Sequence, residues 1–127
     1  LLGISLGLKR IHRLGRSWIE IQPRKWGTHG DVKPANILWY PGPDGGDLGR
    51  LAICDFGFTR FHEEESRSAA QACGMTVTYR APEAGTGPSC RASDMWSLGC
   101  VILEFLTWYL LGPEQVESFT TLRVEED

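Results

Sequence analysis

The sequence predicts an α+β fold that is mostly helical, with one β-hairpin and one buried central helix. Apolar residues recur at three- and four-residue spacing near the start of the chain, and a long apolar run lies near its end. Between them, two short apolar segments flank a turn rich in glycine and proline. The first two patterns are typical of helices and the third of paired strands. A chain of 127 residues suffices for one small domain or part of a larger one.

The first predicted helix covers residues 1–15, because its apolar residues share one face and Gly15 can end it. Residues 16–28 contain breakers such as Pro23 and are expected to be irregular. The apolar face consists of Leu1, Ile4, Leu8 and Ile11.

The predicted hairpin joins residues 37–40 to residues 51–54, both short runs rich in β-branched and other apolar residues. A polar loop over residues 28–36 precedes it. Residues 41–49 hold four glycines and two prolines, which is the chemistry of a turn. Residues 56–93 show no periodic apolar pattern, so we expect a long functional loop there.

The last strong pattern predicts a helix that starts at Asp94, with Ser93 as its cap, and stops at Gly112. Apolar residues cover nearly its whole circumference, so we expect it, including Trp96, to be buried in the core. Glu104 interrupts the apolar run, which favours a core helix over a membrane span. A short helix and a frayed acidic tail are expected to follow.

Composition and charge exclude several classes of protein. Hydrophobic residues make up 42% and charged residues 23%, which argues against disorder, collagen and low-complexity repeats. The formal net charge is −3, but residues 1–33 carry seven basic against two acidic side chains. Few aromatic residues interleave with that basic end, so a solvated helix face is expected. We therefore predict no nucleic-acid and no membrane partner, and composition leaves the oligomeric state open.

The four cysteines lack zinc-binding spacing, and the three histidines do not complete a zinc pattern. Reduced thiols in an intracellular protein are expected, in the cytoplasm with the nucleus left open.

Polar residues flank the predicted hairpin where its outer ends should meet. Asp31 precedes the first strand, Asn36 begins it, and Asp55 follows the second. Paired antiparallel strands would bring these residues together into a hard-oxygen site suited to Mg²⁺. Lys33 adds a positive charge. A metal, a cation and a spare carboxylate are what phosphoryl transfer requires.

Four short motifs stand out along the chain. They are His29-Gly30-Asp31-Val32-Lys33-Pro34-Ala35-Asn36, Asp55-Phe56-Gly57, Ala81-Pro82-Glu83 and Ser93-Asp94-Met95-Trp96-Ser97-Leu98-Gly99. In this order they resemble the catalytic loop, the metal-binding triplet, the end of the activation segment and the central helix of eukaryotic protein kinases. On these motifs the chain is identified as a member of the eukaryotic protein kinase superfamily, of serine/threonine type and fungal-like. The first motif is called the catalytic-loop segment below.

The resemblance implies that residues 1–115 form part of a kinase large (C-terminal) lobe, with 116–127 as an acidic tail. Asp31 would be the catalytic base and Lys33 would contact the transferred phosphate, so both are expected to be catalytic. Asn36 and Asp55 would hold Mg²⁺, and these two with Lys33 would bind ATP. The implied cofactors are ATP and Mg²⁺, and the implied substrates are serine or threonine hydroxyls of proteins.

The resemblance also assigns supporting roles. His29 would brace the metal-binding triplet, and Thr76 would lie near the base. Gly30 stands where many kinases have an arginine that pairs with a phosphorylated residue, so activation would not strictly require phosphorylation.

The chain contains no glycine-rich phosphate loop, no strand lysine and no helix with that lysine's glutamate partner. These parts belong to the small lobe, and the last helices of the large lobe are missing too. We therefore expect the isolated chain to bind ATP feebly and to be inactive by itself.

Two alternatives stay open. One is a small-molecule phosphotransferase of the aminoglycoside or choline kinase type, whose brief motif resembles His29-Gly30-Asp31 with Asn36. The segment Ala81-Pro82-Glu83 argues against it. The other is a catalytically impaired kinase-like scaffold or binding module, because a fold does not guarantee activity.

Overall fold

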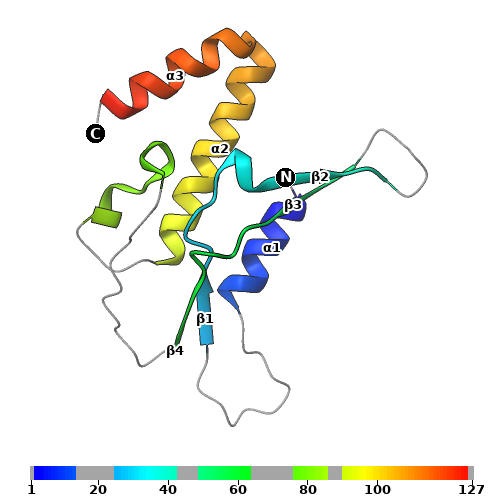
Figure 1. Ribbon diagram of the computed structural model, residues 1–127, viewed down its shortest axis with the longest axis vertical. Coiled ribbons are helices and arrows are strands. Elements are labelled where there is room, and N and C mark those ends of the chain that lie inside the picture. The colour runs from blue at the N-terminus through cyan, green and yellow to red at the C-terminus, as the bar shows by residue number, and fades with distance from the viewer. Residues whose placement is uncertain (1, 14–24, 43–48, 64–75, 86–89, 126–127) are drawn as a thin grey trace.

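The computed structural model describes residues 2–13, 25–42, 49–63, 76–85 and 90–125, arranged as Figure 1 shows. The described residues form three α-helices and two small antiparallel sheets. The helices are α1 (Leu2–His12), α2 (Arg91–Leu111) and α3 (Pro113–Glu125). The strands are β1 (Lys25–Thr28), β2 (Ile37–Tyr40), β3 (Arg50–Ile53) and β4 (Arg60–Glu63). The 3₁₀ turns are η1 (Pro34–Asn36), η2 (Val77–Tyr79) and η3 (Pro82–Gly85).

The core lies between α1, the catalytic-loop segment and the first half of α2. As predicted, Ile4, Leu8 and Ile11 form the buried face of α1. They pack with Val32 and with two α2 residues, Leu98 and Val101. The helix ends at His12, short of the predicted Gly15, which lies outside the described residues. Burial of this apolar cluster fixes α1 against α2.

The predicted hairpin is confirmed. β2 and β3 pair antiparallel with Ile37 opposite Ile53 and Tyr40 opposite Arg50. The second strand covers residues 50–53, one residue earlier than expected. Residues 43–48 of the predicted turn lie outside the described part of the chain.

A second strand pair is a correction. β1 pairs with β4, with Thr28 opposite Arg60, although residues 16–28 and 56–93 were expected to lack regular structure. Both strands are four residues long and mostly polar, so neither shows the alternation that predicts a strand. Their pairing depends on a partner far along the sequence. Within those two ranges, residues 16–24, 64–75 and 86–89 are outside the described residues.

The start of α2 also differs from the prediction. The helix begins at Arg91 with Cys90 at its N-cap position, and Ser93 and Asp94 are buried inside its first turn. Their side chains bond to other segments instead of capping the helix: the Ser93 hydroxyl donates to Glu83 at 3.4 Å. The predicted end is confirmed, since Gly112 has a φ of 92° and donates its amide to the Trp108 carbonyl.

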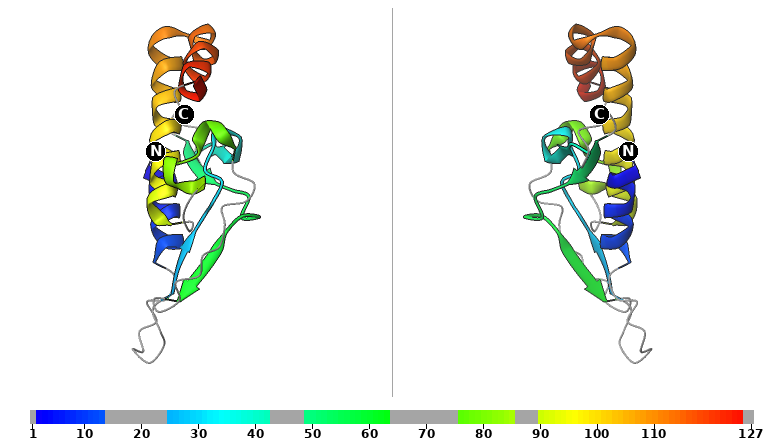
Figure 2. Two further views of the ribbon diagram at one scale, coloured as in Figure 1. Left: turned by 90° about the vertical axis from the view of Figure 1, so that its left-hand side faces the viewer. Right: turned by 90° about the vertical axis from the view of Figure 1, so that its right-hand side faces the viewer.

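Burial of α2 is confirmed only for its first half. The side chains that face the core there lie between Ser93 and Val101. The second half is mostly exposed and contacts η2 and α3, which turns back beside it (Figure 2). Trp96 is 48% exposed, so its expected place in the core is wrong. By length and composition α2 could cross a membrane, yet the polar residues buried in its first turns bond to the rest of the fold.

α3 is longer than the short helix expected at the acidic end. It spans 13 residues and packs on α2 and on η2.

Candidate active site

The catalytic-loop segment holds Asp31 against Asn36. Pro34 begins η1, and its fixed φ suits the first position of a helical turn. This turn brings the Asn36 amide nitrogen 2.8 Å from the Asp31 carbonyl and 3.0 Å from its carboxylate oxygen Oδ2. Both side chains are buried. The carboxylate of Asp31 therefore has a fixed direction.

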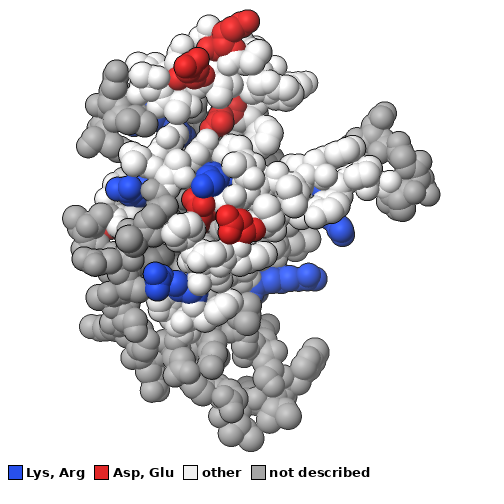
Figure 3. All heavy atoms as spheres, viewed as in Figure 1, with Lys and Arg blue, Asp and Glu red and all other residues white. Residues whose placement is uncertain are grey.

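Lys33 completes this cluster. Its ammonium lies 2.8 Å from Asp31 Oδ2 and donates to the Thr76 hydroxyl at 3.3 Å. Thr76 is thus close to the predicted base, as expected. Figure 3, which has the same view as Figure 1, shows positive and negative side chains side by side near the centre of the molecule, around the start of β2. One carboxylate oxygen consequently faces both a cation and an amide donor.

Asp55 lies next to this cluster through the backbone. The Cys54 amide donates to the Asn36 carbonyl at 2.9 Å, which places the end of β3 beside η1. Asp55 has a φ of 63°, and its carboxylate accepts the Gly57 amide at 3.1 Å. The side chain is exposed. The hairpin thus brings Asp31, Asn36 and Asp55 to one place, with the Asp55 carboxylate open to solvent.

The oxygens at this place fit Mg²⁺ as its partial ligands. Mg²⁺ usually takes one or two protein oxygens and completes its shell with water and substrate phosphates. Asn36 uses its nitrogen toward Asp31, which leaves the amide oxygen available, and Asp55 supplies an exposed carboxylate. Among the described residues no three His, Cys, Asp or Glu side chains form a metal site by themselves. The set therefore suits a metal that arrives with phosphate.

His29 connects the catalytic loop to the triplet that begins at Asp55. Its Nε2 lies 3.1 Å from the Cys54 carbonyl, and its Nδ1 accepts the Asp31 amide at 3.3 Å. The ring also meets the edge of Phe56, with ring centroids 5.4 Å apart. The side chain is fully buried. These contacts agree with the bracing role expected of His29.

Asp94 anchors the same loop from α2, a role that the sequence analysis missed. Its carboxylate accepts the backbone amides of His29 at 2.8 Å and Gly30 at 2.9 Å. It also lies 2.7 Å from His12 Nε2. Asp94 is 1% exposed. The signal in the sequence was an acidic residue inside an otherwise apolar helix, because buried carboxylates need partners.

Glycine is strongly favoured at position 30. Its φ is +83°, in the left-handed region that favours glycine, and an added Cβ would lie 2.8 Å from the Phe58 carbonyl oxygen. The arginine that many kinases carry here would therefore not fit this backbone without strain.

The segment after Thr76 is held by contacts with α2 and α3. The sequence analysis did not predict these contacts. The Tyr79 hydroxyl donates to Glu104 at 2.6 Å, and Arg123 donates to the Thr78 carbonyl at 2.6 Å. Ser97 donates to the Tyr79 carbonyl. Burial raises the pKa of Tyr79, and the bonded negative charge of Glu104 raises it further.

Comparison with known proteins identifies the family to which this chain belongs. A family model described as the protein kinase domain matches residues 4–124, so the chain belongs to the protein kinase family. The predicted membership of the eukaryotic protein kinase superfamily is thereby confirmed. The match extends past residue 115, where the sequence analysis placed the end of the domain.

Several proteins similar to this chain are cyclin-dependent kinases. The chain is 38% identical over 104 residues to cyclin-dependent kinase 8 of Drosophila melanogaster, covering 79% of this chain and 21% of the relative. It is 41% identical over 87 residues to cyclin-dependent kinase 8 of Caenorhabditis briggsae, covering 65% and 14%. It is 36% identical over 94 residues to cyclin-dependent kinase G1 of Arabidopsis thaliana, and the match covers 72% of this chain and 14% of the relative. The chain thus spans a minor part of the length of these relatives.

Proposed function

We propose that this chain supplies the catalytic loop and metal-binding triplet of an ATP-dependent serine/threonine protein kinase. The reaction would transfer the γ-phosphoryl group of Mg·ATP to a hydroxyl of a protein. The main support for this function is the buried Asp31 carboxylate. Its Oδ2 lies 3.0 Å from the Asn36 amide nitrogen and 2.8 Å from the Lys33 ammonium.

In this proposal Asp31 accepts the proton of the substrate hydroxyl as the new bond to phosphorus forms. Its fixed direction orients that hydroxyl toward the phosphoryl group. The Lys33 ammonium lies between Asp31 and Thr76. In the proposed reaction it balances negative charge on the transferred phosphoryl group. Asn36 and Asp55 would hold Mg²⁺, which when bound neutralises charge on the phosphate oxygens.

The intact cluster favours an enzyme over a kinase-like scaffold. A scaffold has no need for a buried carboxylate fixed by both an amide and a cation, since such a charge is costly to bury. The 127 residues contain no glycine-rich loop to cover phosphates. We therefore propose that strong ATP binding requires small-lobe elements beyond these residues.

The test is phosphotransfer by the protein expressed from its complete gene, with myelin basic protein as a general substrate. Asp31→Asn keeps the shape of the side chain but removes the base, so the rate should fall about 100-fold or more while ATP binding persists. Glu114→Gln, an exposed change on α3, is the matched control and should leave the rate unchanged. An Asp31→Asn enzyme with the wild-type rate would refute the proposal.

A further inference from the structure

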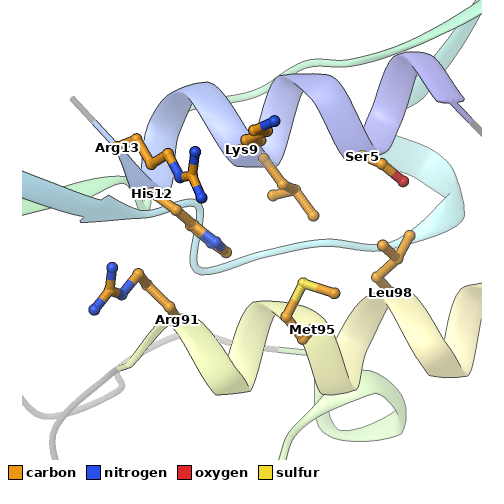
Figure 4. Close-up of a pocket in the computed structure, with 8 residues that line it drawn as sticks. Ser5, Lys9, His12, Arg13, Arg91, Met95 and Leu98 are labelled. Carbon is orange, nitrogen blue, oxygen red and sulfur yellow. The ribbon is translucent and has the colours of Figure 1, made fainter. Parts of the chain in front are cut away.

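A cavity of about 330 Å³ lies between α1 and the start of α2, and it shares no residue with the candidate active site. Figure 4 shows His12 and Arg13 at one end of it, facing Arg91 across the gap, and Leu98 at the other end. Its volume is at the lower end of the range for small-molecule sites.

The basic end of the cavity holds cationic side chains that pair with no carboxylate among the described residues. Lys9 and Arg13 line it and make no ion pair with any acidic residue in the described ranges. The Arg91 guanidinium lies over the Trp26 ring, 5.3 Å from its centroid, which orients the group and leaves its charge in place. Arg13 and Arg91 therefore place two cations at one end of the cavity, and Lys9 lines its α1 side.

Asp94 does not itself line the cavity. It reaches the cavity wall only through His12, at 2.7 Å, and it is 1% exposed. Its two oxygens are already occupied by the backbone amides of His29 and Gly30. An anion in the cavity would consequently meet donors rather than a competing carboxylate.

The rest of the cavity is apolar. Leu8 and Leu98 are almost fully buried and form its floor. Met95 is 53% exposed and projects toward α1, where its flexible thioether can adapt to a ligand. An apolar floor beside a basic end matches a molecule that has one of each.

We propose that this cavity binds a small organic anion: one phosphate or carboxylate group on a compact apolar body. The anionic group lies between Arg13 and Arg91, where charge-assisted hydrogen bonds are strong. The apolar body lies on Met95 and Leu98. The site is separate from the site proposed for phosphoryl transfer.

The experiment uses the 127-residue chain with ¹³C-methyl methionine, because the chain has only two methionines, Met75 and Met95. Met95→Leu assigns the signal of the cavity. Phenyl phosphate and phenylacetate are the probes, which separate phosphate from carboxylate as the preferred group. We expect a saturable shift of the Met95 methyl signal with a Kd of about 1 mM for at least one probe. Inorganic phosphate and benzyl alcohol should each bind about tenfold more weakly, since each lacks one half of the ligand.

Charge variants complete the test. Arg13→Gln and Arg91→Gln should each weaken binding about fivefold. Arg10→Gln is the matched control, because Arg10 is an exposed cation of the same helix outside the cavity, and it should change Kd less than twofold. The proposal fails if no probe gives a saturable shift, if Arg10→Gln weakens binding equally, or if inorganic phosphate binds as tightly, which would mean an adventitious ion only. No outcome depends on kinase activity.

Discussion

The carboxylate of Asp94 in α2 accepts a 2.9 Å hydrogen bond from the backbone amide of Gly30, which lies 64 positions earlier in the chain. Asp94 also accepts a hydrogen bond from the neighbouring backbone amide of His29 and pairs with the His12 side chain. Asp31 follows directly on Gly30, so a buried helix fixes where the proposed base lies. Stability of the fold and geometry of the site are therefore linked through one side chain.

Replacement of Asp94 should be among the most destabilising single changes. Asp94→Ala leaves two buried amides without an acceptor and His12 without its partner, which costs about 3 kcal/mol or more. Urea unfolding measures this loss. Asp94→Asn keeps part of the hydrogen bonding and provides a measurable value if Asp94→Ala does not fold. Glu114→Gln should stay within about 0.5 kcal/mol of wild type. A loss below about 1 kcal/mol for Asp94→Ala would show that the bonds are dispensable.

Two glycine substitutions should have opposite effects. Gly30→Ala is expected to cost about 2 kcal/mol, because a left-handed φ is unfavourable and the Cβ would press on the Phe58 carbonyl. Gly99 lies inside α2, and an added Cβ there meets no atom within 4 Å. Gly99→Ala should therefore stabilise the fold by about 1 kcal/mol. Denaturant midpoints of the two variants test the pair, and equal effects would contradict the backbone argument.

Tyr79 should make stability depend on alkaline pH. Burial and Glu104 raise its pKa in the folded state above its usual value near 10. Between these two values the folded state keeps a proton that the unfolded state has lost, so stability falls as pH rises above about 10. Below pH 10 both states are protonated and the contribution is complete.

The measurement compares the free energy of unfolding at pH 8.5 and at pH 11 in wild type and in Tyr79→Phe. The variant should lose about 1 kcal/mol at the lower pH, through loss of its bond to Glu104, and should show a weaker decline at the higher one. Tyr109→Phe is the control, since Tyr109 is 78% exposed. The same decline in Tyr79→Phe as in wild type would disprove the assignment.

Lys33 should matter for rate more than for stability. Lys33→Met removes the cation 2.8 Å from Asp31, and phosphotransfer by the complete gene product should fall about 100-fold. Thermal unfolding should show a loss of about 1 kcal/mol, because Asp31 is buried but keeps its hydrogen bond from Asn36. Arg10→Gln, a distant cation on α1, should leave the rate unaltered. Equal rates in wild type and Lys33→Met would exclude a catalytic role for Lys33.

Several parts of the fold follow from patterns that neighbouring residues carry. The spacing of Ile4, Leu8 and Ile11 predicted the buried face of α1, and Gly112 predicted the end of α2. The hairpin that places Asn36 near Asp55 also followed from its own two apolar segments and the turn between them. In each case the residues that decide the structure are close together in the chain.

Other features could not be predicted this way. Four features differ from the expectation or were absent from it. They are the pairing of β1 with β4, the start of α2 at Arg91, the hydrogen bond from the Gly30 amide to Asp94 and the exposure of Trp96. Each depends on contacts between residues distant in the chain, and the energy of such a contact does not appear in any local pattern. Periodicity and motif spacing thus identified the kinase family and its candidate residues, whereas packing of α2 on the catalytic loop established how those residues are held.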